Sequence, residues 1–358
     1  MIEPKSHDAP GSLGHVIECI PAECYENPTW KGLVWFARDL AVYALIVAAL
    51  VYFDHPLLLV PLWLVSGLAI SALFIVGHDA AHGALFKNKR LAYLVGQAAM
   101  LPGLHVYEAW CFGHNRIHHG HTTRQEMDYV WHPATREQYE KLGAFGKLAH
   151  RIKWSFLGGG IYYGWDIWWN SMMRFQAPDK IADAVNRDRR IVWTYAGVAS
   201  TALLTLGGFW YGTFSGALWM WTKVFAIPFV AWNYSIGVTV YIHHIAADIT
   251  WHARREWTKF RGQMEGTTVI HLPAYLNFFY HNIYLHVAHH VDMRIPFYGL
   301  PAATEALRKN YGSTIRERAY SLRDYLATTR ACKLFDFERG VWCDYQGRQT
   351  TAPMSEAA

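Results

Sequence analysis

The sequence from residue 56 to residue 82 reads PLLLVPLWLVSGLAISALFIVG, followed at once by HDAAH. No charged residue interrupts its first part, residues 56–77. An α-helix rises about 1.5 Å per residue, so this stretch can cross a hydrocarbon core roughly 30 Å thick. The sequence therefore predicts a membrane-spanning helix that ends at two histidines, His78 and His82, at the edge of the bilayer.

Three more membrane spans are expected around this helix. One precedes it across a two-residue turn. Farther along, the chain is almost free of charge from residue 191 to residue 247, and the segment from Gly212 to Gly216 divides this region into two. We therefore expect an all-α membrane protein with four transmembrane helices arranged as two hairpins. The expected spans are residues 32–53, 56–77, 191–211 and 222–242.

Composition and charge agree with a membrane protein. Hydrophobic residues make up 52% of the chain and charged residues 17%, against about 25% charged in soluble domains. Of the 33 Lys and Arg residues, three precede residue 39, fifteen lie in residues 87–190, one lies in the second turn and fourteen follow residue 244. Positive residues favour cytosolic loops, so we expect a multi-pass protein with both termini in the cytosol. This distribution indicates contact with anionic lipid headgroups and no binding of nucleic acid.

Helices outside the spans are expected to form a cytosolic cap. Residues 91–113 and 154–173 are aromatic and apolar but each carries an acidic residue, which favours helices that lie in the membrane interface. The sequence divides into a cytosolic N-terminal segment, residues 1–30, a membrane domain, residues 31–301, and a cytosolic C-terminal helical segment and tail, residues 302–358.

Eight of the 20 histidines occur in three short clusters. In each cluster two histidines are three or four residues apart, and this spacing places both imidazoles on one face of a helix. With the expected topology, all three clusters lie on the cytosolic side of the membrane. The cluster histidines are His78 and His82; His114, His118 and His119; and His286, His289 and His290.

The number of histidines indicates a centre with two metal ions. Imidazole binds iron, zinc, copper and nickel, and a structural zinc needs only four ligands. A non-haem di-iron centre that reacts with O₂ is the best chemical fit to eight or more imidazoles. His244, at the end of the fourth span, is a further candidate because ionisable groups inside membranes are commonly functional. Asp79, next to His78, is a candidate for orienting an imidazole.

A metal transporter or sensor is a competing hypothesis, since it could also collect histidines. Such a protein would be expected to place its ligands near the bilayer midplane on broken helices. Here the clusters flank the expected spans, which favours an enzyme.

Three motifs resemble those of the membrane fatty acid desaturase family. They are HDAAHGALF from residue 78, GHNRIHHGHT from residue 113 and HNIYLHVAHHVDMRIP from residue 281. The similarity extends over roughly residues 30–300 and includes the segment YIHH, which ends at His244. It implies that the eight cluster histidines, His244 and His281 bind the two irons, with Asp128 and Asp292 as supporting residues.

The resemblance also implies a reaction. Such a centre takes two electrons and O₂, removes two hydrogens from a buried acyl chain of a lipid or thioester, and releases water. The sequence contains no HPGG haem-binding motif, so the electrons are expected from a separate donor of the ferredoxin or cytochrome b5 type. Histidine-box hydroxylases and monooxygenases that act on lipids, alkanes or carotenoids are the alternative. The order of the clusters and the end of the third motif favour the desaturase.

Overall fold

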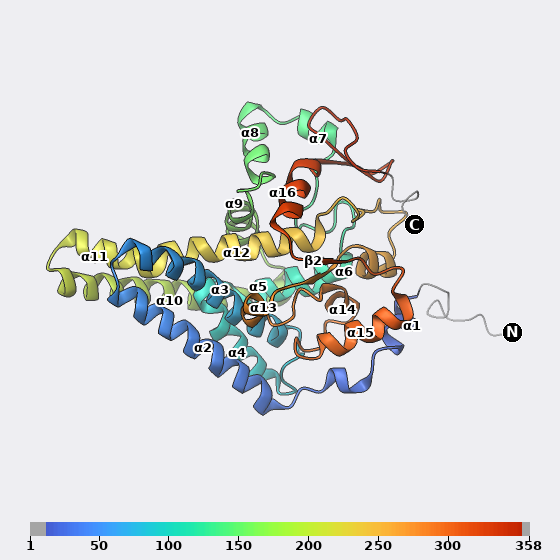
Figure 1. Ribbon diagram of the computed structural model, residues 1–358. Coiled ribbons are helices and arrows are strands. Elements are labelled where there is room, and N and C mark those ends of the chain that lie inside the picture. The colour runs from blue at the N-terminus through green and yellow to red at the C-terminus, as the bar shows by residue number, and fades with distance from the viewer. Residues whose placement is uncertain (1–11, 353–358) are drawn as a thin grey trace.

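The computed structural model describes residues 12–352 and is mostly helical (Figure 1). Four helical stretches are long and apolar enough to cross a membrane. They are α2 (Thr29–Tyr52), α3 (Pro56–Ala81), α10 (Asp179–Tyr211) and the stretch Phe214–His244, which comprises α11 (Phe214–Trp221), η5 (Thr222–Ala226) and α12 (Ile227–His244). Their ends project together on one side of the molecule, at the left of Figure 1.

The second pair of long helices differs from the expected spans in its boundaries. Helix α10 begins at Asp179, and the next helix begins at Phe214, earlier than the expected residue 222. The turn needs only two residues. Gly212 ends α10 with a φ of 68°, a left-handed conformation that glycine adopts without strain, and the Thr213 side chain accepts a hydrogen bond from the backbone N–H of Gly216.

Asp54, in the link between α2 and α3, ties the two pairs of long helices together at the end remote from the histidines. Its carboxylate lies 2.8 Å from the Lys223 ammonium and accepts a hydrogen bond of 2.7 Å from the Tyr211 hydroxyl. The Lys223 side chain is fully buried, and its ammonium also donates to the carbonyl oxygens of Val51 and Phe53. Lys223, the single Lys or Arg between residues 191 and 244, therefore has a complete set of acceptors.

Lys223→Met should destabilise the protein, because it leaves these acceptors without their donor. Losing a partner of a buried polar group costs about 1–3 kcal/mol, so the apparent melting temperature in detergent, followed by tryptophan fluorescence, should fall by several degrees. Lys309→Met, at an exposed position of the same charge, is the matched control and should melt like the wild type. Equal melting temperatures for the two variants would contradict this account of Lys223.

Several helices join α3 to α10. The helix expected for residues 91–113 is interrupted, whereas residues 159–173, within the second expected helix at 154–173, form one continuous helical stretch. Pro102 lies in a tight turn that interrupts the first expected helix. The elements are α4 (Lys89–Met100), η2 (Leu101–Gly103), α5 (Tyr107–Cys111), η3 (Phe112–His118), α6 (His119–His121), α7 (Arg136–Glu140), α8 (Ala144–Lys153), α9 (Gly159–Tyr162) and η4 (Tyr163–Met173).

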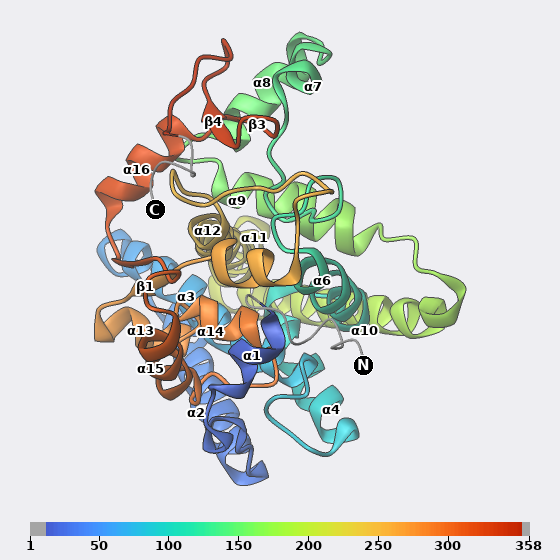
Figure 2. The same cartoon turned by 90° about the vertical axis from the view of Figure 1, so that its right-hand side faces the viewer.

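The remaining elements cover the side of the molecule that Figure 2 turns toward the viewer. Four short strands occur here, so the expectation of a purely helical protein is incomplete. Strand β1 pairs in parallel with β2, and β3 pairs in antiparallel fashion with β4. The elements are α1 (Leu13–Glu18), η1 (Ala22–Tyr25), η6 (Arg261–Glu265), β1 (Val269–His271), α13 (Ala274–Tyr280), α14 (His286–Val291), α15 (Leu300–Tyr311), β2 (Glu317–Ala319), α16 (Leu322–Ala331), β3 (Leu334–Asp336) and β4 (Val341–Cys343).

Candidate metal centre

The three histidine clusters and the end of α12 meet at one end of the long helices. This is the end that the sequence analysis expects on the cytosolic side. His78 lies in the last turn of α3, and His82 caps that helix. The second cluster is carried by η3, a π-helix of seven residues, and by α6. The wider turn of a π-helix is rare and occurs frequently at functional sites. The third cluster forms most of the short helix α14.

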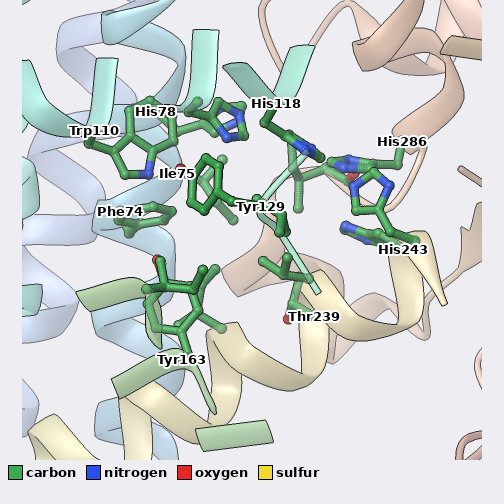
Figure 3. A pocket seen from close by; sticks show the side chains of 17 residues that line it. Phe74, Ile75, His78, Trp110, His118, Tyr129, Tyr163, Thr239, His243 and His286 are labelled. Carbon is green, nitrogen blue, oxygen red and sulfur yellow. The ribbon is translucent and has the colours of Figure 1, made fainter. Parts of the chain in front are cut away.

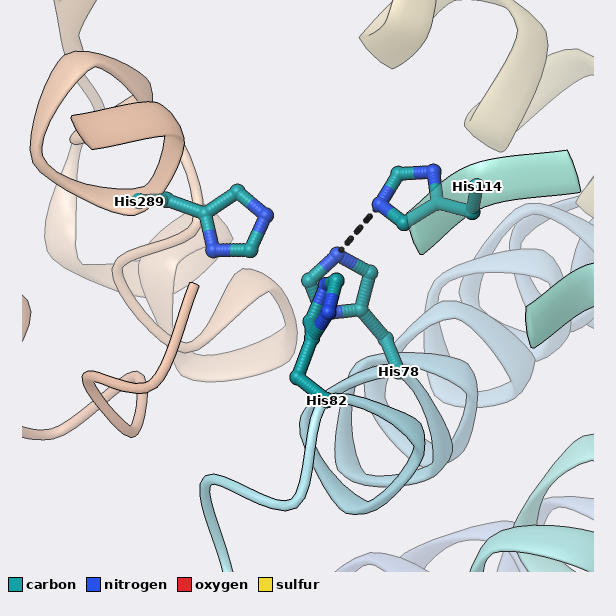
Figure 4. A group of neighbouring side chains, drawn as sticks. All are labelled: His78, His82, His114 and His289. Atoms are coloured by element: carbon teal, nitrogen blue, oxygen red, sulfur yellow. Dashed lines mark hydrogen bonds between the residues drawn. The ribbon is translucent and has the colours of Figure 1, made fainter. Parts of the chain in front are cut away.

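The first group of histidines consists of His78, His82, His114 and His289 (Figure 4). Each offers one ring nitrogen, and these four nitrogens all lie within 4.8 Å of one another. They come from the end of α3, from η3 and from α14, and more than 200 residues of sequence lie between α3 and α14. Their imidazoles point toward a common centre in Figure 4, as the ligands of a single metal ion do.

The second group consists of His118, His244 and His290, whose ring nitrogens also lie within 4.8 Å of one another. All three side chains are buried. His244 reaches this group from the end of α12, where the sequence placed it as a candidate ligand. The two groups together contain six of the eight cluster histidines and His244, and each is large enough to hold one metal ion.

Three further histidines connect the two groups. His119 lies with its Nε2 3.1 Å from that of His114, and its ring stacks on His290 at 4.4 Å. His286 lies with its Nε2 3.2 Å from that of His290, and His243 stacks on His286 at 3.8 Å. Ten histidines thus form one continuous cluster. His243 was not among the expected ligands, although its position beside His244 at the end of a span was a usable signal.

Burial favours the neutral form of at least five of the ten imidazoles. Removal from water, reinforced by the neighbouring imidazoles, holds the pKa well below the ordinary value for His82, His114, His119, His289 and His290. A neutral imidazole keeps a lone pair on one ring nitrogen, and this is the form that binds a metal ion.

The nitrogen positions of the first group fit a metal ion better than a network of hydrogen bonds. His114 Nε2 lies 3.2 Å from Nε2 of His78 and 3.1 Å from Nε2 of His119. One proton on His114 can bridge to only one of these neighbours. Nδ1 of His78 donates to Asp79 at 2.8 Å, so Nε2 of His78 is the nitrogen with the lone pair.

Several other ring nitrogens of the cluster are buried and have no hydrogen-bond partner within residues 12–352. They are Nε2 of His243, His244 and His289, and both ring nitrogens of His82. Unpartnered buried polar atoms are costly, and a bound cation is the group that would satisfy lone pairs converging in this way. The residues present therefore fit two metal ions with imidazole ligands.

Carboxylates orient one histidine in each group. Asp79 accepts from His78 Nδ1 and also from the backbone N–H of Phe297, at 2.6 Å. Asp128 accepts from His118 Nδ1 at 3.0 Å and from the backbone N–H of Thr123 at 2.9 Å. Such partners fix the tautomer and the direction of a metal-binding imidazole. Asp79 and Asp128 are two of the three aspartates that the sequence analysis gave as candidates for supporting residues.

Two other positioning residues were missed by sequence reasoning. Gln263, in η6, accepts from His290 Nδ1 at 2.8 Å and donates to the backbone carbonyl of His119 at 2.6 Å. Thr122 lies with its hydroxyl 3.2 Å from His290 Nδ1. Gln263 lies outside all three motifs, and no pattern in its own segment indicates a role at a metal site.

The structure does not bring His281 or Asp292 to the histidine groups. His281 Nε2 lies 2.7 Å from Asp39, and Arg38 packs on the same buried pair. Asp292 pairs with Arg294 and accepts a hydrogen bond from the Tyr25 hydroxyl. Both residues have complete sets of partners elsewhere, so the expected metal ligand at His281 and the expected imidazole partner at Asp292 are not supported by the geometry.

An apolar pocket adjoins both histidine groups. Figure 3 shows His118, His243 and His286 on one side of it and Tyr163 on the opposite side. Its walls come from α3, α5, η3, η4 and α12 and are mostly aromatic and aliphatic. Besides these four residues, the lining consists of Phe74, Ile75, His78, Trp110, His114, Tyr129, Val130, Ile167, Ile236, Thr239, Val240, His244 and Ile283.

Known proteins are similar to this chain over most of its length. Residues 54–319 match the family described as "Fatty acid desaturase". A relative from Nostoc sp., the sn-1 acyl-lipid omega-3 desaturase (ferredoxin), is 30% identical over 85% of this chain and 82% of its own. The sn-1 oleoyl-lipid 12-desaturase of Synechocystis sp. is 26% identical over 95% and 94% of the two chains.

A chloroplastic relative extends the same similarity to plants. The omega-6 fatty acid desaturase of Glycine max is 26% identical over 95% of this chain and 77% of its own. The family match covers well over half of the residues and includes all three histidine motifs. The chain therefore belongs to the fatty acid desaturase family and is an oxidoreductase.

Proposed function

We propose that this protein is a membrane acyl-lipid desaturase that introduces a C=C double bond into an acyl chain. The observation that carries this proposal is the contact between two histidine groups and one apolar pocket, which would hold a methylene chain against two metal ions. The Synechocystis and Nostoc relatives are acyl-lipid desaturases, and this similarity supports an acyl lipid as the substrate class.

The proposed reaction balances with O₂ and two electrons. A –CH2–CH2– unit, O₂, two electrons and two protons become –CH=CH– and two water molecules. Two bound irons would supply the redox chemistry that activates O₂. The proposed ligands are the eight cluster histidines and His244, and His243 is an additional member of the same cluster. A zinc site is a poor alternative because zinc has no redox chemistry.

The protein's own residues would position the substrate and keep water away. The pocket presents few polar groups other than the imidazoles, so an acyl chain can replace water there without losing hydrogen bonds. Tyr163, opposite the histidines, is fixed by a hydrogen bond of 2.9 Å from its hydroxyl to His105 Nε2, while His105 Nδ1 donates to the Gly103 carbonyl. Burial lowers the pKa of His105 to about 3, so this ring remains a neutral acceptor.

We propose that the four long helices cross the membrane as two hairpins, with the histidine cluster and both termini in the cytosol. The distribution of Lys and Arg supports this orientation, and the Asp54 contacts with Lys223 and Tyr211 join the two turns on the opposite side. Residues 31–301 would then form the membrane domain, preceded and followed by cytosolic segments.

A separate protein would supply the electrons. The name of the Nostoc relative includes ferredoxin, and the sequence of this chain contains no haem-binding motif of the HPGG type. A ferredoxin or a cytochrome of the b5 type is the proposed donor.

Expression in a bacterial host that makes no polyunsaturated lipids, together with a ferredoxin and its reductase, tests the proposal. We expect a new fatty acid that is two mass units lighter than its precursor, with the double bond located by mass spectrometry of a derivative. A chain carrying His289→Ala should give no such product. An oxygenated fatty acid in place of the unsaturated one would assign the protein to the hydroxylases and overturn the proposal.

A further inference from the structure

The segment between α12 and β1 carries a concentration of positive charge next to the histidine cluster. Arg254, Arg255, Lys259 and Arg261 are exposed, and Glu256 is the only acidic residue among residues 254–261. We call residues 254–261 the basic segment. It lies on the side that faces the viewer in Figure 2, opposite the turns that connect the long helices. With the long helices crossing the membrane as proposed, the basic segment lies beyond their ends. It is therefore more accessible to a soluble partner than to the lipid surface.

The charges of the basic segment are available for a partner. Arg254, Arg255 and Lys259 form no ion pair with any carboxylate in the part of the chain that the structure describes. Within residues 12–352 the Arg261 guanidinium pairs with no carboxylate and donates to the backbone carbonyl of Glu256 at 3.0 Å. Exposed cations of one sign without internal partners attract an acidic surface and accelerate its docking.

Trp257 connects the basic segment to the second histidine group. Its indole Nε1 donates to the backbone carbonyl of Thr122 at 2.8 Å, and the Arg124 guanidinium lies over its ring at 5.2 Å. The Thr122 hydroxyl lies 3.2 Å from His290 Nδ1 and donates to the His118 carbonyl at 2.7 Å. A single residue therefore separates a half-buried tryptophan at the surface from two proposed metal ligands.

The end of the basic segment is packed against the same histidines. Gly262 follows it directly, and a side chain there would lie 2.8 Å from the Trp257 indole nitrogen and 2.9 Å from the Thr122 carbonyl oxygen. Gln263, one residue later, binds His290 Nδ1 and the His119 carbonyl. The exposed charges and the residue that contacts His290 thus belong to one continuous, tightly packed segment, residues 254–263.

We propose that the basic segment and Arg124, centred on Trp257, form the docking surface for an acidic, soluble electron-transfer protein of the ferredoxin class. This inference rests on the proposed function, since a desaturase of this kind needs an external one-electron donor. It adds a specific site on the protein, close to His118 and His290, at which that donor would bind. A partner that docks there would lie nearer to the second histidine group than to the turns of the spans.

Binding of a plant-type [2Fe–2S] ferredoxin to the full-length protein in discs of neutral lipid tests this surface. Reversing two charges with Arg254→Glu and Arg255→Glu should weaken binding at low salt by at least about tenfold, and the difference from the wild type should shrink as salt is raised. The matched control reverses two exposed charges on α16, Arg323→Glu and Arg330→Glu, and should bind ferredoxin within about twofold of the wild type.

A second readout separates this inference from the proposed function. Desaturation driven by ferredoxin should fall in the basic-segment variant, while desaturation driven by dithionite should remain at the wild-type level. Unchanged ferredoxin binding in that variant would overturn the docking surface even if the wild type makes double bonds. Unchanged ferredoxin binding together with weaker binding to phosphatidylglycerol vesicles would assign the surface to lipid, with the same consequence. Weaker ferredoxin binding in a protein that makes no double bonds would support the surface and contradict the proposed function.

Discussion

His289→Ala and His118→Ala are each expected to abolish desaturation and to lower the bound iron below two per chain. His289 belongs to the first histidine group and His118 to the second, and each contributes one of the converging ring nitrogens. Removing it leaves a metal position one ligand short, and the remaining histidines of the group cannot supply another nitrogen at that place. Iron analysis of the purified variants, with product analysis of membrane lipids, measures both effects.

His281→Ala is the informative control for these variants. Its imidazole is buried like those of the ligands, but it pairs with Asp39 and lies outside both groups. This variant should melt at a lower temperature, because a buried carboxylate loses a partner, and should still bind two irons per chain. Loss of iron in His281→Ala, or full activity in His118→Ala, would contradict the ligand set proposed here.

Asp128→Asn is expected to reduce iron affinity or turnover by roughly 10–100-fold, the usual range for partners of metal-binding imidazoles. The two carboxylate oxygens accept from His118 Nδ1 and from the backbone N–H groups of Thr123 and Val130. An asparagine offers one oxygen and one NH2 group to these donors, so an N–H would face another N–H. Iron titration and turnover of the variant check this result.

Asp292→Asn is the matched control, because it makes the same chemical change at another buried aspartate near the third cluster. Asp292 binds Arg294 and Tyr25 and touches no imidazole of the two groups. Iron content and turnover should stay within about twofold of the wild type. If both aspartate variants lose iron equally, the loss would reflect general destabilisation, and the positioning role of Asp128 would be wrong.

Much of the site could be predicted from the sequence because the relevant signals are local. The uncharged stretch before His78 predicts α3, and the spacings of three and four residues predict that His78 and His82, or His286 and His290, share a helix face. The proximity of Asp79 to His78 followed from adjacency. These relations depend on helix geometry alone and do not require knowledge of distant residues.

Other features depend on contacts that no local pattern records. Gln263 reaches His290 across 27 residues, and Lys223 reaches Asp54 across 169. The parallel pairing of β1 with β2 joins segments about fifty residues apart and was not foreseen, because strands of three residues carry almost no periodic signal.

The sequence by itself determined that the chain has four apolar stretches long enough to cross a membrane and three histidine clusters suited to metal binding, since hydropathy and helical spacing are properties of short segments. Only the tertiary structure decided which histidines share a group. His289 joins His78, while its neighbour His290 joins His118 and His244. His281, five residues before His286, turns away to Asp39. The reason is that each imidazole's neighbours are set by how α3, η3, α12 and α14 pack together, and packing is a property of the whole fold.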